Sequence, residues 1–179
     1  MKKVFKITLI IFFILCSNLL AQWEVNIDSD IIYFMNIDKY NESTFAVAVY
    51  TAIADDFSSV YDNDSIATVL VFSTQIKKNT NLYFRIKRKS GNYINYSINN
   101  DEDIIEDDED NIYILIGAES DSGIRGDNLI KILLDSVNIE LYNKNTDELL
   151  GSHNLKGLEE ILKENLGDTE WYVKNIKNQ

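Results

Sequence analysis

The alternation of apolar and polar residues predicts β-strands through the first two thirds of the chain. Trp23, Val25 and Ile27 alternate with polar residues in a first strand. Similar strand-like stretches follow at 31–37, 44–54, 67–73, 82–88, 93–98 and 112–118. Polar segments separate them, and Gly91-Asn92 is a tight-turn sequence. Because Ala46 and Ala48 alternate with larger apolar residues, the strand at 44–54 is predicted to be covered on both faces.

After a loop at 119–126, the pattern predicts a helix and then a hairpin. Asp127 is expected to cap a helix over 127–135, because its carboxylate can accept from the free N–H groups of the first turn. The apolar stripe of this helix is Leu129, Ile130, Leu133 and Leu134. Val137, Ile139 and Leu141 then alternate with polar residues as in a half-buried strand. Turn residues at 144–147 predict a return strand at 149–154.

A second helix is predicted over 154–166, with Asn154 as its cap and Gly167 just beyond its end. Its apolar face consists of Leu155, Leu158, Ile161, Leu162 and Leu166. Trp171, Tyr172 and Val173 follow in a tail that is expected to pack back on the sheet. Short strands with helices only near the C-terminus predict a mainly β fold, an antiparallel β-sandwich or open barrel, as a single domain over 22–179.

Residues 1–21 are predicted to be a signal peptide. Lys2, Lys3 and Lys6 precede an apolar run that is too short to span a bilayer, and Ala21 is a suitable cleavage point. The segment before Cys16 lacks the small residues of a lipoprotein signal, so cleavage without lipidation is expected. The expected location is the periplasm or the outside of a bacterial cell, with no stable membrane insertion after cleavage. The mature chain would contain no cysteine and therefore no disulfide.

The net charge of the chain limits which kinds of molecule it can bind. The signal segment carries three lysines and no acidic residue, so its removal takes the net charge from −12 to −15. Such an anionic chain is unsuited to binding nucleic acid or anionic lipid. A divalent cation or a basic protein remains compatible with it.

The candidates for catalysis are weak. His153 is the only histidine, and it is interpreted as a surface residue near a strand end, because Ser152 beside it cannot share its face of a strand. One histidine and no mature cysteine do not make a zinc site. Paired carboxylates for glycoside hydrolysis are defined by a distance rather than a spacing, so the sequence leaves them open. We expect no enzymatic activity, no catalytic residues and no cofactor.

The acidic run at 101–110 offers oxygen ligands for Ca²⁺, but it lacks the glycine of an EF-hand loop, and Ile104-Ile105 interrupts it. An exposed, self-repelling loop is the preferred interpretation, with a calcium-dependent binding module as the alternative. Residues 62–65 and 121–123 are similar, weaker candidates that turns explain better.

The basic and aromatic residues have structural explanations. The basic patch, Arg85, Lys87, Arg88 and Lys89, could bind an anion or a partner, although pairing with the acidic run would account for it. The ten tyrosines, eight phenylalanines and two tryptophans are compatible with sugar stacking. Packing of strand aromatics in a core is the preferred interpretation.

The order of elements resembles a family of exported bacterial β-sandwich proteins. This family includes type VI secretion-associated periplasmic proteins and is similar to the invasion-associated locus B group. The resemblance is carried by Trp23, by segments 68–72, 80–84, 130–134 and 137–141, and most sharply by 155–161. Two cysteines frequent in the family are absent, and Phe72 stands in the position of one. The resemblance implies a non-enzymatic envelope protein that acts through contacts with another envelope or secreted protein.

Overall fold

The computed structural model describes most of the chain after the expected signal segment. The described residues are 23–28, 31–38, 43–50, 68–74, 80–99, 103–106, 112–116 and 123–177. The predicted signal peptide, Cys16 and the polar segment at 55–65 lie outside these ranges.

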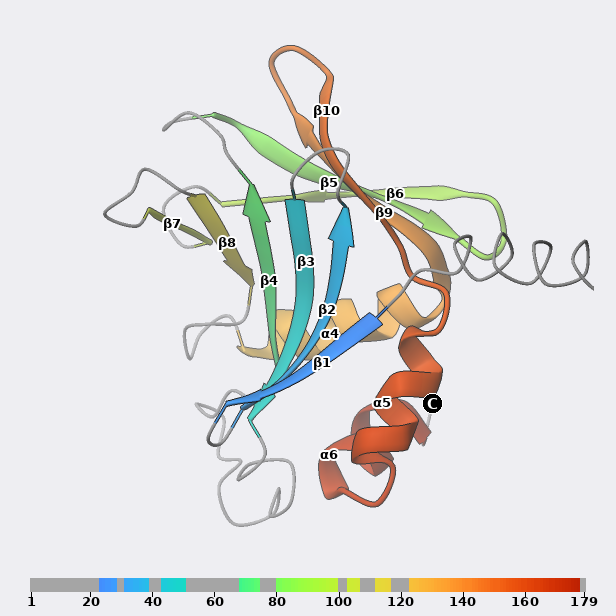
Figure 1. The fold of residues 1–179 in the computed structure, drawn as a ribbon. Helices are drawn as coiled ribbons and strands as arrows, with labels where there is room; N and C mark the ends of the chain where they lie inside the picture. The colour runs from blue at the N-terminus through green and yellow to red at the C-terminus, as the bar shows by residue number, and fades with distance from the viewer. Residues whose placement is uncertain are drawn as a thin grey trace, which may run out of the picture.

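Six strands form one antiparallel sheet in the order β1-β2-β3-β4-β8-β7 (Figure 1). Their bounds are β1 Trp23–Asp28, β2 Ile31–Asp38, β3 Ser43–Tyr50, β4 Thr68–Thr74, β7 Ile104–Glu106 and β8 Ile112–Ile116. Both faces of β3 are buried, as predicted, since Ala46 and Ala48 are enclosed nearly as fully as Phe45, Val47 and Val49.

Four strands form a second antiparallel sheet in the order β10-β9-β5-β6. Their bounds are β5 Leu82–Arg88, β6 Tyr93–Ser97, β9 Ser136–Asn143 and β10 Glu148–Asn154. The prediction of a mainly β fold with antiparallel sheets and short helices is confirmed. The hairpin turn at 144–147 and the tight turn before β6 are also found where they were expected.

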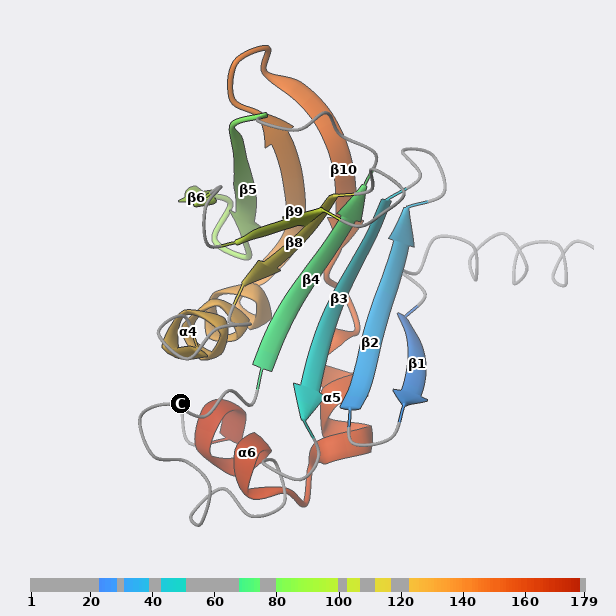
Figure 2. The ribbon, with the colours of Figure 1, turned by 90° about the vertical axis from the view of Figure 1, so that its left-hand side faces the viewer.

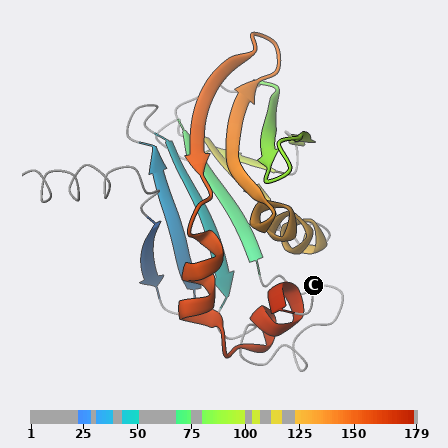
Figure 3. The same ribbon diagram turned by 90° about the vertical axis from the view of Figure 1, so that its right-hand side faces the viewer.

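The helices of the described part are α4 Gly123–Leu134, α5 Leu158–Leu166, α6 Glu170–Tyr172 and the π-helical turn η2 Val173–Lys177. Helices α5 and α6 lie at the end of the molecule opposite the β9–β10 turn, and α4 lies between that end and the four-stranded sheet (Figures 2 and 3). Helix α4 contacts strands of both sheets, β4 and β8 on one side and β5 and β9 on the other. It therefore closes one end of the core.

The core contains the apolar faces that alternation predicted. Inward-facing residues include Ile32 and Phe34 of β2, Leu82, Phe84 and Ile86 of β5, Ile139 and Leu141 of β9, Leu129, Ile130 and Leu133 of α4, and Leu158, Leu162 and Leu166 of α5. Trp171 is fully buried in the same cluster, so the C-terminal tail packs back on the core, where α6 contacts α5 and η2 contacts α4. Burial of such a ring contributes a large share of core stability.

Helix α4 begins a full turn earlier than the sequence predicted. Asp127 is therefore inside the helix and not at its cap, and residues 123–126 of the expected loop at 119–126 are helical. Gly126 is buried and lies on the same stripe as Leu129, Ile130 and Leu133. Packing of this stripe outweighs the low helix propensity of the two glycines in the first turns.

Helix α5 begins later than predicted, and Asn154 does not cap it. Asn154 is the last residue of β10, opposite Asn138, and its Oδ1 accepts from Lys156 N at 2.9 Å. The chain turns at Gly157, whose φ of 88° is left-handed, and the helix starts at Leu158. Asn154 therefore belongs to the β9–β10 ladder and does not cap the helix, although the sequence pattern predicts it as the cap.

One predicted core residue of β9 is exposed. The β5–β9 register shifts between Lys87 and Arg88, so Asn138 and Ser136 have partners while Val137 between them has none in that ladder. Val137 is 40% exposed as a result. A bulge of this kind interrupts the alternation of faces that the sequence pattern assumes.

The acidic run is not wholly exposed. Asp103 is completely buried, and its Oδ2 accepts from Asn99 N at 2.8 Å. Asp103 N in turn donates to Asn99 O at 2.8 Å. The next three residues form β7, which pairs with β8. Because Ile104 and Ile105 pair with β8, this part of the acidic run belongs to the six-stranded sheet.

Candidate functional site

The only histidine is in the interior, so its interpretation as a surface residue was wrong. His153 lies on β10, where Gly151 and His153 are buried and Ser152 between them is partly exposed. The exposed fraction of His153 is 0%. Its ring lies 5.9 Å, between centroids, from the ring of Phe45 on β3. The inward face of β10 meets the six-stranded sheet here, which the local sequence does not reveal.

Two side chains from the six-stranded sheet contact the imidazole. Ser43 Oγ of β3 lies 3.1 Å from Nε2, and Asn36 Oδ1 of β2 lies 3.1 Å from Nδ1. Asn36 Nδ2 donates to Asn154 O at 3.3 Å, which leaves Oδ1 as the acceptor on the ring side. We therefore assign the proton of the neutral ring to Nδ1, with the Ser43 hydroxyl donating to Nε2.

The imidazole is neutral at ordinary pH. Burial lowers the pKa of His153 to about 4, although the charge of Asp38 and a hydrogen bond with Asn36 act in the opposite direction. Loss of hydration disfavours the cation more than the nearby carboxylate favours it.

The hydroxyl of Ser43 donates to Nε2, and Nδ1 donates to the amide oxygen of Asn36. A nucleophilic triad has hydrogen bonds in the same directions. Ser43 is 1% exposed and Asn36 is 6% exposed, so the cluster is closed to solvent. None of its three residues lines either of the two clefts that flank α5. In this conformation a substrate cannot reach Ser43 Oγ, and the cluster joins the two sheets.

The two clefts lie on either side of α5. One, of about 550 Å³, lies between the four-stranded sheet and the start of α5, and the other, of about 640 Å³, lies between α5 and the C-terminal helices. Charged residues lining the first are Lys87, Lys89, Lys156, Glu140, Glu159 and Glu160. Because the lysines and glutamates are equal in number, the lining has no net preference for an anion or a cation.

Three residues of the predicted basic patch, Arg85, Lys87 and Arg88, have side-chain partners outside the acidic run. The Arg85 guanidinium lies 4.6 Å from the ring centroid of Tyr142 and 4.0 Å from Asp147 Oδ1. The Lys87 ammonium lies 5.8 Å from the ring centroid of Tyr93. These contacts lie on the outer face of the four-stranded sheet, so cation–π attraction accounts for much of the patch.

Tyr83 and Tyr142 form a cross-strand pair on that same outer face, rather than in the core. Their rings are stacked with centroids 5.5 Å apart and an angle of 17° between planes. Burial, followed by the charge of Glu140, raises the pKa of Tyr142. The two rings and Arg85 cover one another, so a sugar would have to displace these contacts in order to stack.

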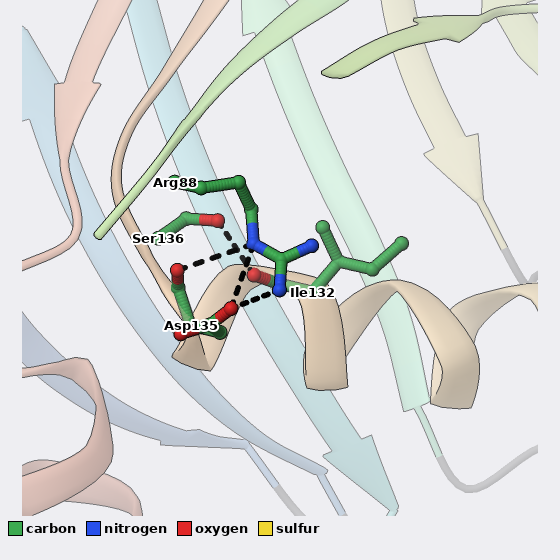
Figure 4. A network of polar contacts seen from close by, with 4 residues as sticks. All are labelled: Arg88, Ile132, Asp135 and Ser136. Carbon is green, nitrogen blue, oxygen red and sulfur yellow. Dashed lines mark hydrogen bonds and ion pairs between the residues drawn. The ribbon is translucent and has the colours of Figure 1, made fainter. Parts of the chain in front are cut away.

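Arg88 joins the end of β5 to the end of α4 (Figure 4). Its guanidinium makes an ion pair with the carboxylate of Asp135, and Nε also lies 3.3 Å from Asp135 O. Ser136 Oγ donates to Ile132 O at 2.6 Å. A cation near the last carbonyls of a helix is favourable, so this network holds the α4–β9 corner in place.

The structure supplies no cation site in the part of the acidic run that it describes. The carboxylate of Asp103 is buried and accepts from the backbone. Within the described ranges, no group of three or more His, Cys, Asp or Glu side chains could hold a metal ion. Residues 101–102, 107–110, 62–65 and 121–122 lie outside those ranges.

Comparisons with protein-family models, with curated proteins and with solved structures found no match. No helix of the described part is long and apolar enough to cross a membrane. Fold and site together define a protein of two antiparallel sheets, joined by a polar network around a buried histidine.

Proposed function

We propose that this protein is exported to the bacterial envelope and acts there without catalysis, through contacts with another envelope or secreted protein. The proposal combines the expected signal peptide with the nature of the site. Export is supported by the basic start, the short apolar run and the small residue at Ala21.

The burial of the Ser43–His153–Asn36 cluster is the observation that carries the non-enzymatic role. These residue types in this order could activate a nucleophile if substrate had access. The cluster is closed instead, and both ring nitrogens are engaged in contacts between strands. Exposed apolar side chains such as Val25 and Ile27, which share one face of β1 and are 38% and 66% exposed, suit contacts with another protein.

Recovery of a specific partner from the envelope tests the contact role. The tagged protein, exported by its host, is used to capture envelope proteins, and each candidate is then purified and titrated against it. Saturable binding by one purified envelope protein is expected. If no candidate binds after purification, the contact role is wrong. Mass spectrometry of the exported protein tests cleavage after Ala21, and a retained Met1 or a lipid on Cys16 would contradict it.

A thermal melt with and without millimolar Ca²⁺ tests the calcium alternative. A ligand that binds only the folded state must raise the melting temperature. We expect no rise. A rise that is abolished by Asp107→Asn and Asp108→Asn together would favour a calcium-dependent module.

A further inference from the structure

Strand β1 is an edge of the six-stranded sheet, at the right of Figure 2. Within the described residues it pairs only with β2, through six consecutive pairs and without a register shift. The backbone groups directed away from β2 can therefore pair with a further strand. Its sequence contains no proline or lysine, and its two charged residues, Glu24 and Asp28, are both acidic, so they disfavour pairing with an acidic strand more than with a basic one.

The core-facing side of this edge is incompletely covered. Val25 and Ile27 lie opposite Phe34 and Ile32, which are 0% and 8% exposed. Val25 and Ile27 themselves are 38% and 66% exposed. The apolar layer between the sheets thus continues to the last strand, and an added strand could cover it with apolar side chains of its own.

The start of β1 is held in place. Trp23 Nε1 donates to Lys156 O at 3.0 Å, and its ring makes an edge contact with Phe45 at 6.3 Å between centroids. The edge is therefore ordered before any partner arrives, which lowers the entropic cost of pairing.

We propose that β1 accepts an extended, basic segment of a partner protein as an additional antiparallel or parallel strand. Apolar side chains of that segment would cover Val25 and Ile27, and its basic side chains would lie on the opposite face, beside Glu24. Main-chain hydrogen bonds provide affinity in this mode, and alternate side chains provide specificity.

Charge favours a basic partner over a second copy of this chain. Glu24 is exposed on the other face of β1, and the whole chain carries a net charge of −12. Two copies would repel each other, whereas a cationic segment would be attracted. The inference rests on the proposed contact function and names the class of partner.

The test uses a synthetic heptapeptide of alternating valine and lysine, with a valine–glutamate peptide of equal length as its control. Binding to the exported protein is measured by calorimetry and by amide chemical shifts of residues 23–28. The lysine peptide is expected to bind, and the glutamate peptide to bind at least tenfold more weakly. Absence of binding, or equal binding of both peptides, would overturn the inference.

Ile27→Lys should weaken binding of the lysine peptide at least tenfold, because it places a charge against the apolar side chains of the added strand. Val137→Lys is the matched control, since Val137 is exposed on β9 and should leave binding unchanged. Ile27→Thr tests the same contact if the lysine variant melts at a lower temperature. Unchanged peptide binding in both Ile27 variants would overturn the inference, as would dimerisation of the wild type that Ile27→Lys abolishes.

Envelope capture with the same variants separates this inference from the proposed function. A purified partner that binds Ile27→Lys as tightly as wild type would refute the role of the edge and leave the contact function standing. If the peptide binds at β1 but no envelope partner is found, the result would support strand addition at β1 and refute the contact function.

Discussion

Nδ1 of His153 lies 3.1 Å from Oδ1 of Asn36, so a strand of one sheet is bonded to a strand of the other. The same two strands are joined again where Ser152 N donates to Asp38 Oδ2 at 3.2 Å and where Asn36 Nδ2 donates to Asn154 O. Hydrogen bonds between polar groups therefore connect β2 and β10, and each of them requires one particular alignment of the two sheets.

Stability should depend on pH through His153. Its pKa is about 4 in the folded protein and 6.5 in the absence of burial. Between these values the unfolded chain binds a proton that the folded chain does not. The free energy of unfolding should therefore fall as pH falls from 6.5 to 4, by up to about 1.4 kcal/mol per pH unit, and then level off.

Urea unfolding at several pH values across this window measures the dependence, with His153→Gln as the comparison. Asp38 faces the ring and is present in both proteins, so the difference in slope between them isolates the histidine. Wild type should lose more stability than the variant across the window. Identical slopes would show that His153 titrates normally and is not enclosed.

Ser43→Ala should cost about 1–3 kcal/mol, because it removes the hydroxyl that bonds to the buried Nε2 of His153. Ser152→Ala is a suitable control, since Ser152 is only partly buried on the outward side of β10, and it should cost less. Urea unfolding gives both values. An equal loss in the two variants would contradict a special role for the buried hydroxyl.

A fluorophosphonate probe should leave Ser43 unlabelled in the folded protein, because the hydroxyl is enclosed. Denatured protein provides the background level of labelling. Rapid, saturable labelling of folded wild type that Ser43→Ala removes would contradict the non-enzymatic proposal.

Leu158→Asp should be severely destabilising. Leu158 is 1% exposed on the buried face of α5, and burial of an unpaired carboxylate costs several kcal/mol. Leu149→Asp is the matched control, because Leu149 is 40% exposed and its replacement should change stability little. Thermal melts of both variants make the comparison, and equal melting temperatures would contradict the placement of α5.

Gly157→Ala should destabilise the fold by about 1–2 kcal/mol, since a left-handed residue with a Cβ is strained. A Cβ here would meet Trp23 Cδ1 at an ordinary contact distance of 3.6 Å, so backbone conformation and not crowding is the cause. Gly157→Asn should cost less, because asparagine tolerates this conformation better. Urea unfolding can rank the two variants, and a smaller loss for alanine would contradict this explanation.

Alternation along the chain was sufficient to predict most strands, because one face of each strand must be apolar to enter the core. Leu82, Phe84 and Ile86 of β5 illustrate this, as all three are buried while Tyr83, Arg85 and Lys87 are not. Helix ends were less predictable. Asp127 and Asn154 are residue types that often cap helices. Helix α4 begins earlier because Gly126 packs in the core on the same side of the helix as Leu129. Helix α5 begins later because Asn154 pairs in β10.

The site could not be predicted in this way, because its members are far apart in the chain. Ser43 and Asn36 are 110 and 117 residues from His153, and no local pattern connects them. From His153 and its neighbours alone, a surface position near a strand end was the reasonable interpretation. The amino-acid order therefore sufficed for the strands and for the apolar face of α5, where the determining interaction is burial at a regular period. The interior position of His153 and the exposure of Val137 arose only when the two sheets came together, because they depend on sheet alignment and on a bulge between strands.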